Sequence, residues 1–256
     1  MVEHTALLAL AVEIGCRMQE SGAEIYRVEE AVRRIFQSYG VDTGQVFAIP
    51  NCLIVSVIDN DGRPISRLRR IPIHGTDICR IERVYDFCRT VCRETPDVDT
   101  ALAQLCALDA RRPAFPAWAQ LLGYFLGAGA SALFWGGNFR DAAAGGICGL
   151  AIGVCLICMA RLNANLFVKT VIAAFLSALL AIGLVQAGVG EHAALVTIGA
   201  LMTLTPGLIF TNFMRDIMAG DTVAGLIKLV EALLTGGAIA VGTFVAMAAA
   251  AGLWRV

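Results

Sequence analysis

The stretch from Ala200 to Ala232 limits the possible folds more than any other part of the chain. It begins as an apolar run of the kind that crosses a membrane, and Thr205-Pro206-Gly207 interrupts it while it is still apolar. Because proline lacks a backbone N–H and glycine loosens the next turn, we expect a helix to break here. A helix broken at membrane depth frees backbone groups that can hold a substrate or an ion.

Polar and ionisable side chains follow this break inside a stretch that stays largely apolar. A charge at the centre of a bilayer costs about 3 kcal/mol or more, so such charges usually face a cavity or a pathway. Each of them also has an ordinary interpretation, such as a kink, a helix cap or a polar loop. Glu231 is harder to explain in that way, because it lies about 15 Å along the last apolar run if the run is helical. The residues in question are Asn212, Arg215, Asp216, Asp221, Lys228 and Glu231.

The composition divides the chain into two unlike parts. Of its 256 residues 57% are apolar, and the mean hydropathy is +0.71, which is too high for a soluble protein of this size. Most Lys and Arg residues precede Pro113, so we predict an α+β soluble domain over 1–112 and an all-α, multi-pass membrane domain over 113–256. The formal net charge of −1 argues against nucleic acid as a partner, whereas the apolar part requires a lipid bilayer.

The soluble part has helical spacing at both ends and β patterning in the middle. Asn60-Asp61-Gly62 is a strong turn signal, so the two runs on either side of it should form an antiparallel hairpin. The predicted helices are Thr5–Glu20, a second that follows Glu24 and runs to about Tyr39, Thr76–Arg93 and Asp97–Arg111, and the predicted strands are Gln45–Ile49, Cys52–Asp59 and Pro64–Ile71.

The start of the second helix is crowded with charge. Gly22 can end the first helix, and Ser21 and Glu24 have the spacing of a capping box for the second. The acidic residues here suit the positive end of the helix dipole and a solvated face. A docking or regulatory role is the alternative. The motif residues are Ser21, Gly22, Glu24, Arg27 and Glu29, with Glu30 beside them.

The nine cysteines form no repeated pair motif, and we expect most to be free thiols packed as small apolar residues in a reducing compartment. His74 could pair with Cys79, Cys88 or Cys92, but the spacing fits no closed zinc pattern, so packing is favoured over a metal site. The chain shows no Ser-His-Asp order, P-loop or dinucleotide fingerprint. We therefore expect neither an enzyme nor a cofactor.

Five apolar runs in the second part are long enough to span a bilayer, which takes about 20 residues. Lys and Arg lie mainly in the loops that share a side with the first domain, so the positive-inside rule places that domain in the cytoplasm. The first 18 residues show no signal-peptide pattern, which agrees with this orientation. The predicted spans are 116–135, 142–160, 166–187, 193–210 and 222–253.

These motifs resemble the threonine/serine exporter family, in the same order and over nearly the whole chain. The resemblance rests on the soluble-domain motif and on Thr205-Pro206-Gly207 followed by Arg215-Asp216. It implies export across the inner membrane, driven by the proton-motive force. Family members are either one long chain with about ten spans or two chains, and this sequence has five predicted spans. The chain therefore resembles the larger subunit of the two-chain type, which includes a succinate exporter. The resemblance then implies a second small membrane subunit as partner.

We therefore expect a secondary exporter subunit for threonine, serine or a dicarboxylate, with a proton as the coupling ion and a homo-oligomer as one possible assembly. Backbone and hydroxyl groups at Thr205, Pro206 and Gly207 would hold the substrate. Asn212 and Arg215 would bind its carboxylate. Asp216 or Glu231, with Asp221 nearby in sequence, would carry the proton. The alternative is a membrane-anchored regulatory or assembly protein whose soluble domain senses a signal.

Overall fold

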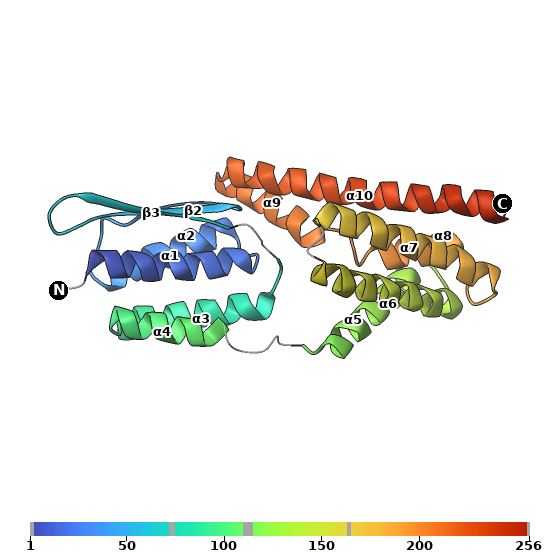
Figure 1. Ribbon diagram of the computed structural model, residues 1–256, viewed down its shortest axis with the longest axis horizontal. Coiled ribbons are helices and arrows are strands. Elements are labelled where there is room, and N and C mark those ends of the chain that lie inside the picture. Colours follow the sequence, from blue (N-terminus) through green and yellow to red (C-terminus); the bar gives the residue numbers. More distant parts are fainter. Residues whose placement is uncertain (1–2, 72–74, 110–114, 163–164, 255–256) are drawn as a thin grey trace. The chain divides into compact units, whose positions relative to one another are not determined.

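The computed structural model describes residues 3–71, 75–109, 115–162 and 165–254 (Figure 1). The chain divides into two compact units. The first unit comprises Met1–Ala114 together with Phe210–Leu229, and the second comprises Phe115–Ile209 together with Val230–Val256. The segment that follows the predicted helix break thus belongs with the soluble part of the chain.

The first unit contains every element that the sequence predicts for the soluble part. Its helices are α1 (His4–Glu20), α2 (Ile25–Ser38), α3 (Ile78–Glu94) and α4 (Val98–Asp109), and its strands are β1 (Gln45–Ile49), β2 (Cys52–Ile58) and β3 (Pro64–Arg70). The strands form one antiparallel sheet in the order β1-β2-β3, with Val55 opposite both Val46 and Arg67. The predicted hairpin is therefore confirmed.

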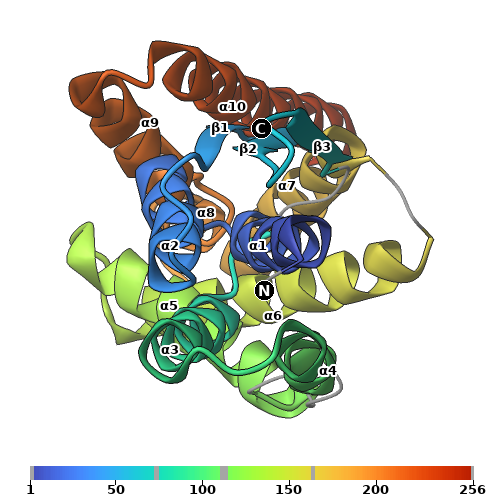
Figure 2. The same ribbon diagram turned by 90° about the vertical axis from the view of Figure 1, so that its left-hand side faces the viewer.

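Three layers make up this part of the unit. The inward side chains of β2, Leu53, Val55 and Val57, are buried against α1, β1 lies against α2, and α3 and α4 lie on the other side of these two helices. Figure 2 shows α1 beside α2 and α3 beside α4, as two rows of helices. Because α1 is enclosed by both neighbouring layers, ten of its residues are buried.

Two glycines with a left-handed backbone shape the first unit. Gly22 has φ +85° and ends α1, and it lets the chain return so that the Gly75 N–H donates to the Glu20 carbonyl at 3.0 Å. A Cβ atom at Gly22 would lie 2.5 Å from the Gly75 carbonyl oxygen. Gly62, in the hairpin turn, has φ +77° but open space around it.

Apolar helices make up the second unit. Among the residues that the structure describes, four helices are long and apolar enough to cross a membrane: α5 (Ala117–Phe134), α6 (Phe139–Arg161), α7 (Leu166–Gln186) and α10 (Thr222–Trp254). The predicted fourth span, 193–210, is not confirmed as one helix. It is divided between α8 (Ala193–Leu201), a non-helical segment at 202–206, and α9 (Gly207–Ala219), because Pro206 cannot donate a helical hydrogen bond.

Small residues let the backbones of the second unit approach closely. A Cβ atom at Gly149 of α6 would lie 2.4 Å from the Tyr124 carbonyl oxygen of α5, and one at Gly199 of α8 would lie 2.7 Å from the Ala132 nitrogen. In lipid the hydrophobic effect does not hold helices together, so their association depends on van der Waals contacts at such close approaches. Helix α5 therefore packs directly against the backbones of α6 and α8.

Replacing Gly22 by Ala should destabilise the first unit more than the same change at Gly62. Both substitutions place a side chain in a left-handed conformation, which costs about 1–3 kcal/mol, but only Gly22→Ala also meets a backbone oxygen. Hydrogen exchange of the α1 and α2 amides in the full chain measures the difference. Equal losses of protection in the two variants would contradict the close approach at Gly75.

Candidate functional site

The predicted helix break lies where the sequence places it, and its groups already have partners inside the chain. The Thr205 hydroxyl donates to the Leu201 carbonyl at 3.2 Å, and the Gly207 N–H donates to the Thr205 carbonyl at 2.8 Å. Thr205 and Gly207 are nevertheless exposed, and Pro206 is half-buried. The break belongs to the second unit, whereas most of α9 belongs to the first.

A buried ion pair joins α9 to the start of α10. Gly220, with φ +98°, reverses the chain between the two helices, and Gly225 permits a close approach because its Cβ atom would lie 3.0 Å from the Phe213 carbonyl oxygen. This hairpin places Lys228 beside Asp216, with Nζ 2.7 Å from Oδ2. The Asp216 side chain is fully buried and that of Lys228 is 12% exposed.

The second carboxylate oxygen of Asp216 is left without a partner. Within the described ranges, no hydrogen-bond donor reaches its buried Oδ1 atom. Buried polar atoms are almost always satisfied, and an unsatisfied one costs about 1–3 kcal/mol. A buried carboxylate oxygen with a free acceptor position is the kind of group that can accept a hydrogen bond from a polar ligand.

Glu24 connects the soluble-domain motif to α9. Its carboxylate pairs with Arg27 one turn along α2, at 2.6 Å, and also with Arg215 of α9. The Glu24 side chain is only 13% exposed, whereas about half of the Arg215 side chain is exposed. Ala224 of α10 belongs to the buried apolar core of the same unit. The α9–α10 hairpin is thus bound to the soluble part by both charge and apolar packing.

The predicted capping box at Ser21 and Glu24 is wrong. Glu24 is the residue before α2, but its side chain makes no cap hydrogen bond, because the carboxylate binds the two arginines instead. The Ser21 hydroxyl turns back and donates to the Arg17 carbonyl at 2.7 Å. Ser21 and Gly22 therefore finish α1 and leave Glu24 directed toward α9.

Glu29 is also held inside the unit rather than on a solvated face. Its carboxylate accepts a hydrogen bond from the Ala48 N–H of β1 at 3.0 Å. Burial raises the pKa of Glu29 above its ordinary value, against the lowering effect of that bond, and the negative charge of Asp221 raises it further. Asp221 thus acts electrostatically on α2. Glu30 is the acidic residue here that faces solvent, paired with Arg34 at 2.5 Å.

The remaining predicted residues are less closely grouped. Asn212 lies half-buried on α9, one turn before Asp216. Glu231 is half-buried on α10 in the second unit, and its carbonyl accepts a hydrogen bond from the Thr235 hydroxyl at 2.9 Å. The first unit therefore brings together Glu24, Arg27, Glu29, Arg215, Asp216 and Asp221 with Lys228, and it does not contain Thr205, Pro206, Gly207 or Glu231.

Sequence reasoning missed one polar centre, which lies in the second unit. Asp141 in the first turn of α6 is fully buried, and its Oδ1 accepts from the backbone N–H groups of Glu191 and His192 at 2.8 and 2.9 Å. Its Oδ2 lies 2.9 Å from His192 Nδ1, and Asn138 completes a capping box. The spacing of Asn138 and Asp141 is a signal that could have revealed the cap.

Among the residues that the structure describes, no group of three or more His, Cys, Asp or Glu side chains could hold an ion. His74, considered above as a metal ligand, lies outside the described residues. Cys88 and Cys92 of α3 are free thiols.

Comparisons with known proteins agree on one family. Residues 9–250 match the family described as "Putative threonine/serine exporter". A "Probable threonine/serine exporter" of Mycobacterium tuberculosis (strain ATCC 25618 / H37Rv) is 23% identical over 245 residues, which cover 94% of this chain and 46% of that protein. The chain thus spans about half the length of this relative. No solved structure matches the chain.

Replacing Lys228 by Met should open the α9–α10 hairpin. The change leaves the Asp216 carboxylate buried and unpaired, and breaking a buried pair in this way costs about 3–5 kcal/mol. Chymotrypsin cleavage after Phe213, which is buried in the intact hairpin, reports the opening.

The double variant Asp216→Asn/Lys228→Met is the matched control, because it removes both charges. We expect it to resist cleavage better than Lys228→Met alone. Equal cleavage rates in the two variants would contradict a stabilising pair at this position.

Proposed function

The chain belongs to the threonine/serine exporter family, and we propose that it is a subunit of a secondary exporter for small polar metabolites. The substrate would be threonine, serine or a dicarboxylate such as succinate, moved outward across the inner membrane. The family match and the four membrane-capable helices support this proposal. Loop charges favour a cytoplasmic position for the soluble domain.

The observation that carries the proposal is the buried Asp216–Lys228 pair, with one oxygen of Asp216 unsatisfied. Buried ionisable groups next to membrane helices commonly serve ion or proton pathways. We propose that Asp216 takes up the coupling proton, since protonation removes its charge and weakens its hold on Lys228. Glu231 and Asp221 are the other candidates for this role.

Substrate would compete with Glu24 for Arg215. A guanidinium binds a carboxylate through two parallel N–H bonds, and Glu24 already supplies a carboxylate to Arg215. A threonine, serine or dicarboxylate carboxyl group would take its place and free α9 from the soluble domain. Asn212 lies on the same helix one turn away and would add a hydrogen bond. From the sequence alone, we propose that Thr205, Pro206 and Gly207 also bind the substrate.

A second small membrane subunit would complete the exporter. The chain spans about half the length of its longer relative, and the family resemblance implies a second subunit. With the interrupted segment 193–210 as a further crossing beside the four membrane-capable helices, each half would have five spans, and the two halves would be inserted in opposite orientations, a common plan for secondary transporters. A homo-oligomer of this chain is the other assembly that would supply a second half.

Flux measurements in liposomes test the proposal. The full chain is reconstituted alone and with a candidate small subunit, a pH gradient is imposed, and labelled serine, threonine and succinate are followed. We expect gradient-driven flux of one of these substrates. Asp216→Asn/Lys228→Met, which removes the proton carrier without leaving Lys228 buried and unpaired, should reduce it to background while substrate exchange without a gradient persists. Glu231→Gln and Asp221→Asn test the other two candidates in the same way.

Asp61→Asn is the matched control, because Asp61 is an exposed carboxylate in the hairpin turn. It should transport as the unmodified chain does. Full gradient-driven flux in Asp216→Asn/Lys228→Met would exclude Asp216 as the proton carrier. No flux of any substrate with the assembly intact would favour the membrane-anchored regulatory or assembly role instead.

A further inference from the structure

An open pocket of about 390 Å³ lies beside the helix break in the second unit. The non-helical segment contributes Thr203 to its lining, and α5 contributes Gln120, Gly123 and Tyr124. Small-molecule sites commonly have volumes of about 300–1,000 Å³, so the pocket has room for an amino acid or a small dicarboxylate. The function proposed above gives none of these four residues a role.

The α5 residues of the pocket lie on one face of the helix. Gln120 is followed by Gly123, Tyr124 and Gly127 at the spacing that brings side chains to the same side. A Cβ atom at Gly123 would have open space around it, and one at Gly127 would lie 3.9 Å from the Thr203 Cγ2 atom. The two missing side chains therefore leave room between this face of α5 and the broken segment.

The polar side chains of the pocket offer mainly hydrogen-bond acceptors. The Gln120 amide nitrogen donates to the Phe115 carbonyl at 3.1 Å, which fixes the orientation of the amide and leaves its oxygen for another donor. The Thr203 hydroxyl gives its one proton to the Ala200 carbonyl at 2.8 Å, so it has only lone pairs left to offer. No charged side chain is found among the described residues that line the pocket.

The break also leaves the backbone carbonyl of Thr203 without a donor. In a continuous helix the Gly207 N–H would bond to this carbonyl, but here it donates to the Thr205 carbonyl at 2.8 Å. No hydrogen bond from the described part of the chain reaches the Thr203 carbonyl oxygen. At membrane depth, irregular backbone is tolerated only where protein buries it or where it lines a polar cavity. The free carbonyl therefore indicates that polar groups enter this pocket.

Tyr124 adds a hydroxyl that the protein itself does not use. It lies about 10 Å along α5, and its half-buried ring packs against α6, where a Cβ atom at Gly153 would lie 2.8 Å from Cδ2. Its hydroxyl makes no hydrogen bond with any residue that the structure describes. Anchoring at the headgroups is the competing explanation, but it suits Trp118, which is exposed near the start of α5.

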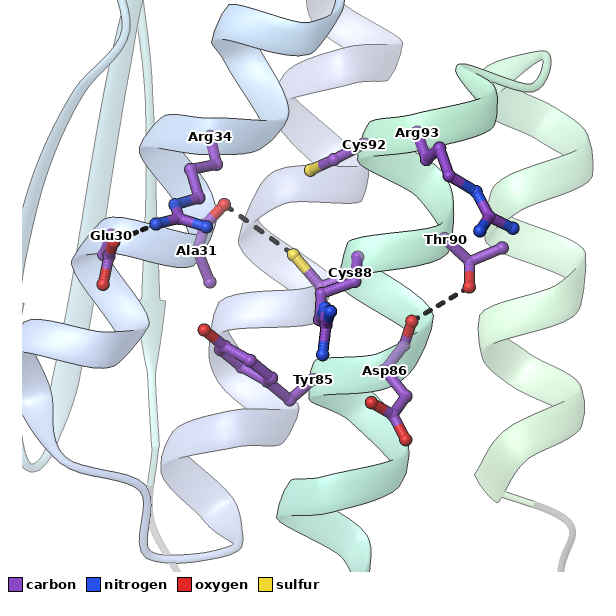
Figure 3. A pocket seen from close by; sticks show the side chains of 10 residues that line it. Glu30, Ala31, Arg34, Tyr85, Asp86, Cys88, Thr90, Cys92 and Arg93 are labelled. Atoms are coloured by element: carbon purple, nitrogen blue, oxygen red, sulfur yellow. Dashed lines mark hydrogen bonds and ion pairs between the residues drawn. The ribbon is translucent and has the colours of Figure 1, made fainter.

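A second hollow, the groove between α2 and α3 of the first unit, differs in this respect (Figure 3). Several of its polar groups already hold one another. Arg34 pairs with Glu30 at 2.5 Å, and the Thr90 hydroxyl donates to the Asp86 carbonyl at 3.0 Å. The pocket beside the break is the better candidate for a ligand, because its acceptors are free.

We propose that the Gln120 and Thr203 oxygens and the Tyr124 hydroxyl bind the ammonium group of an amino-acid substrate. An ammonium group has three N–H donors and no acceptor, so it matches an acceptor-rich pocket. A dicarboxylate offers only acceptors and would leave these oxygens unpaired. The inference rests on the proposed export function and adds to it the residues that recognise the amine.

The place of the pocket along α5 suits an exporter. In the orientation proposed above, α5 follows the cytoplasmic domain, so its first half lies on the cytoplasmic side of the bilayer. Gln120 and Tyr124 belong to that half. The subsite is therefore on the side from which an exported substrate enters.

Equilibrium binding to the full chain in nanodiscs tests the subsite. Labelled L-serine is compared with 3-hydroxypropionate, which is serine without its amino group, and with succinate. Tyr124→Phe removes one hydroxyl, and Gln120→Leu replaces the amide by an apolar group of similar size. Gln186→Leu is the matched control, because Gln186 is an exposed glutamine at the end of α7 and does not line the pocket.

We expect the unmodified chain to bind serine about tenfold more tightly than 3-hydroxypropionate or better, since only serine supplies the ammonium group. Each pocket variant should weaken serine binding by about tenfold, the effect of losing a hydrogen bond to a charged group. Binding of 3-hydroxypropionate should stay unchanged, which also shows that the variants are folded. Gln186→Leu should bind both ligands as the unmodified chain does.

Three results would overturn the subsite. They are equal affinities of the unmodified chain for serine and 3-hydroxypropionate, serine binding that neither pocket variant weakens, and a loss in Tyr124→Phe that is the same for both ligands. Succinate binding without serine binding would overturn it too, while leaving a dicarboxylate exporter. Serine binding that depends on Tyr124, but with no gradient-driven flux, would contradict the export function and leave the subsite standing.

Discussion

The arrangement of the first unit depends on the ion pairs that the Glu24 carboxylate makes with Arg27 and Arg215. This carboxylate is nearly buried, and it neutralises two guanidiniums that come from different parts of the chain, Arg27 on α2 and Arg215 on α9. A largely buried carboxylate needs such partners, since an isolated charge is strongly disfavoured there. Ser21 and Gly22 end α1, and the turn that follows directs Glu24 toward α9. The soluble-domain motif is therefore an attachment point for the segment that follows the helix break.

That attachment explains why the α9–α10 hairpin carries so much charge. Asp216 and Lys228 neutralise each other inside the hairpin, Arg215 binds outward to Glu24, and Asp221 acts on Glu29. Each charge of the hairpin thus has a partner or a neighbour in the first unit. Within this hairpin, Oδ1 of Asp216 is a buried carboxylate oxygen that no hydrogen-bond donor among the described residues reaches.

The soluble elements could be predicted from the sequence, because period-3.6 and period-2 patterns and the Asn60-Asp61-Gly62 turn are local signals. The break near Pro206 followed from backbone chemistry in the same way, although the short α8 that results was not expected. The contact between Glu24 and Arg215 could not be predicted, since it joins residues far apart in sequence. The capping-box prediction failed for that reason: local spacing suggested a cap, and a distant charge took the carboxylate instead.

The long-range ion pair between Glu24 and Arg215 is the central claim, and a double-mutant cycle read by hydrogen exchange of the α9 amides tests it most directly. Glu24→Gln and Arg215→Gln are each expected to lower α9 protection by about 1 kcal/mol, at the upper end for a partly exposed pair. The double variant should lose no more than either single variant. Losses that simply add, or an α9 unaffected by Glu24→Gln, would contradict the account.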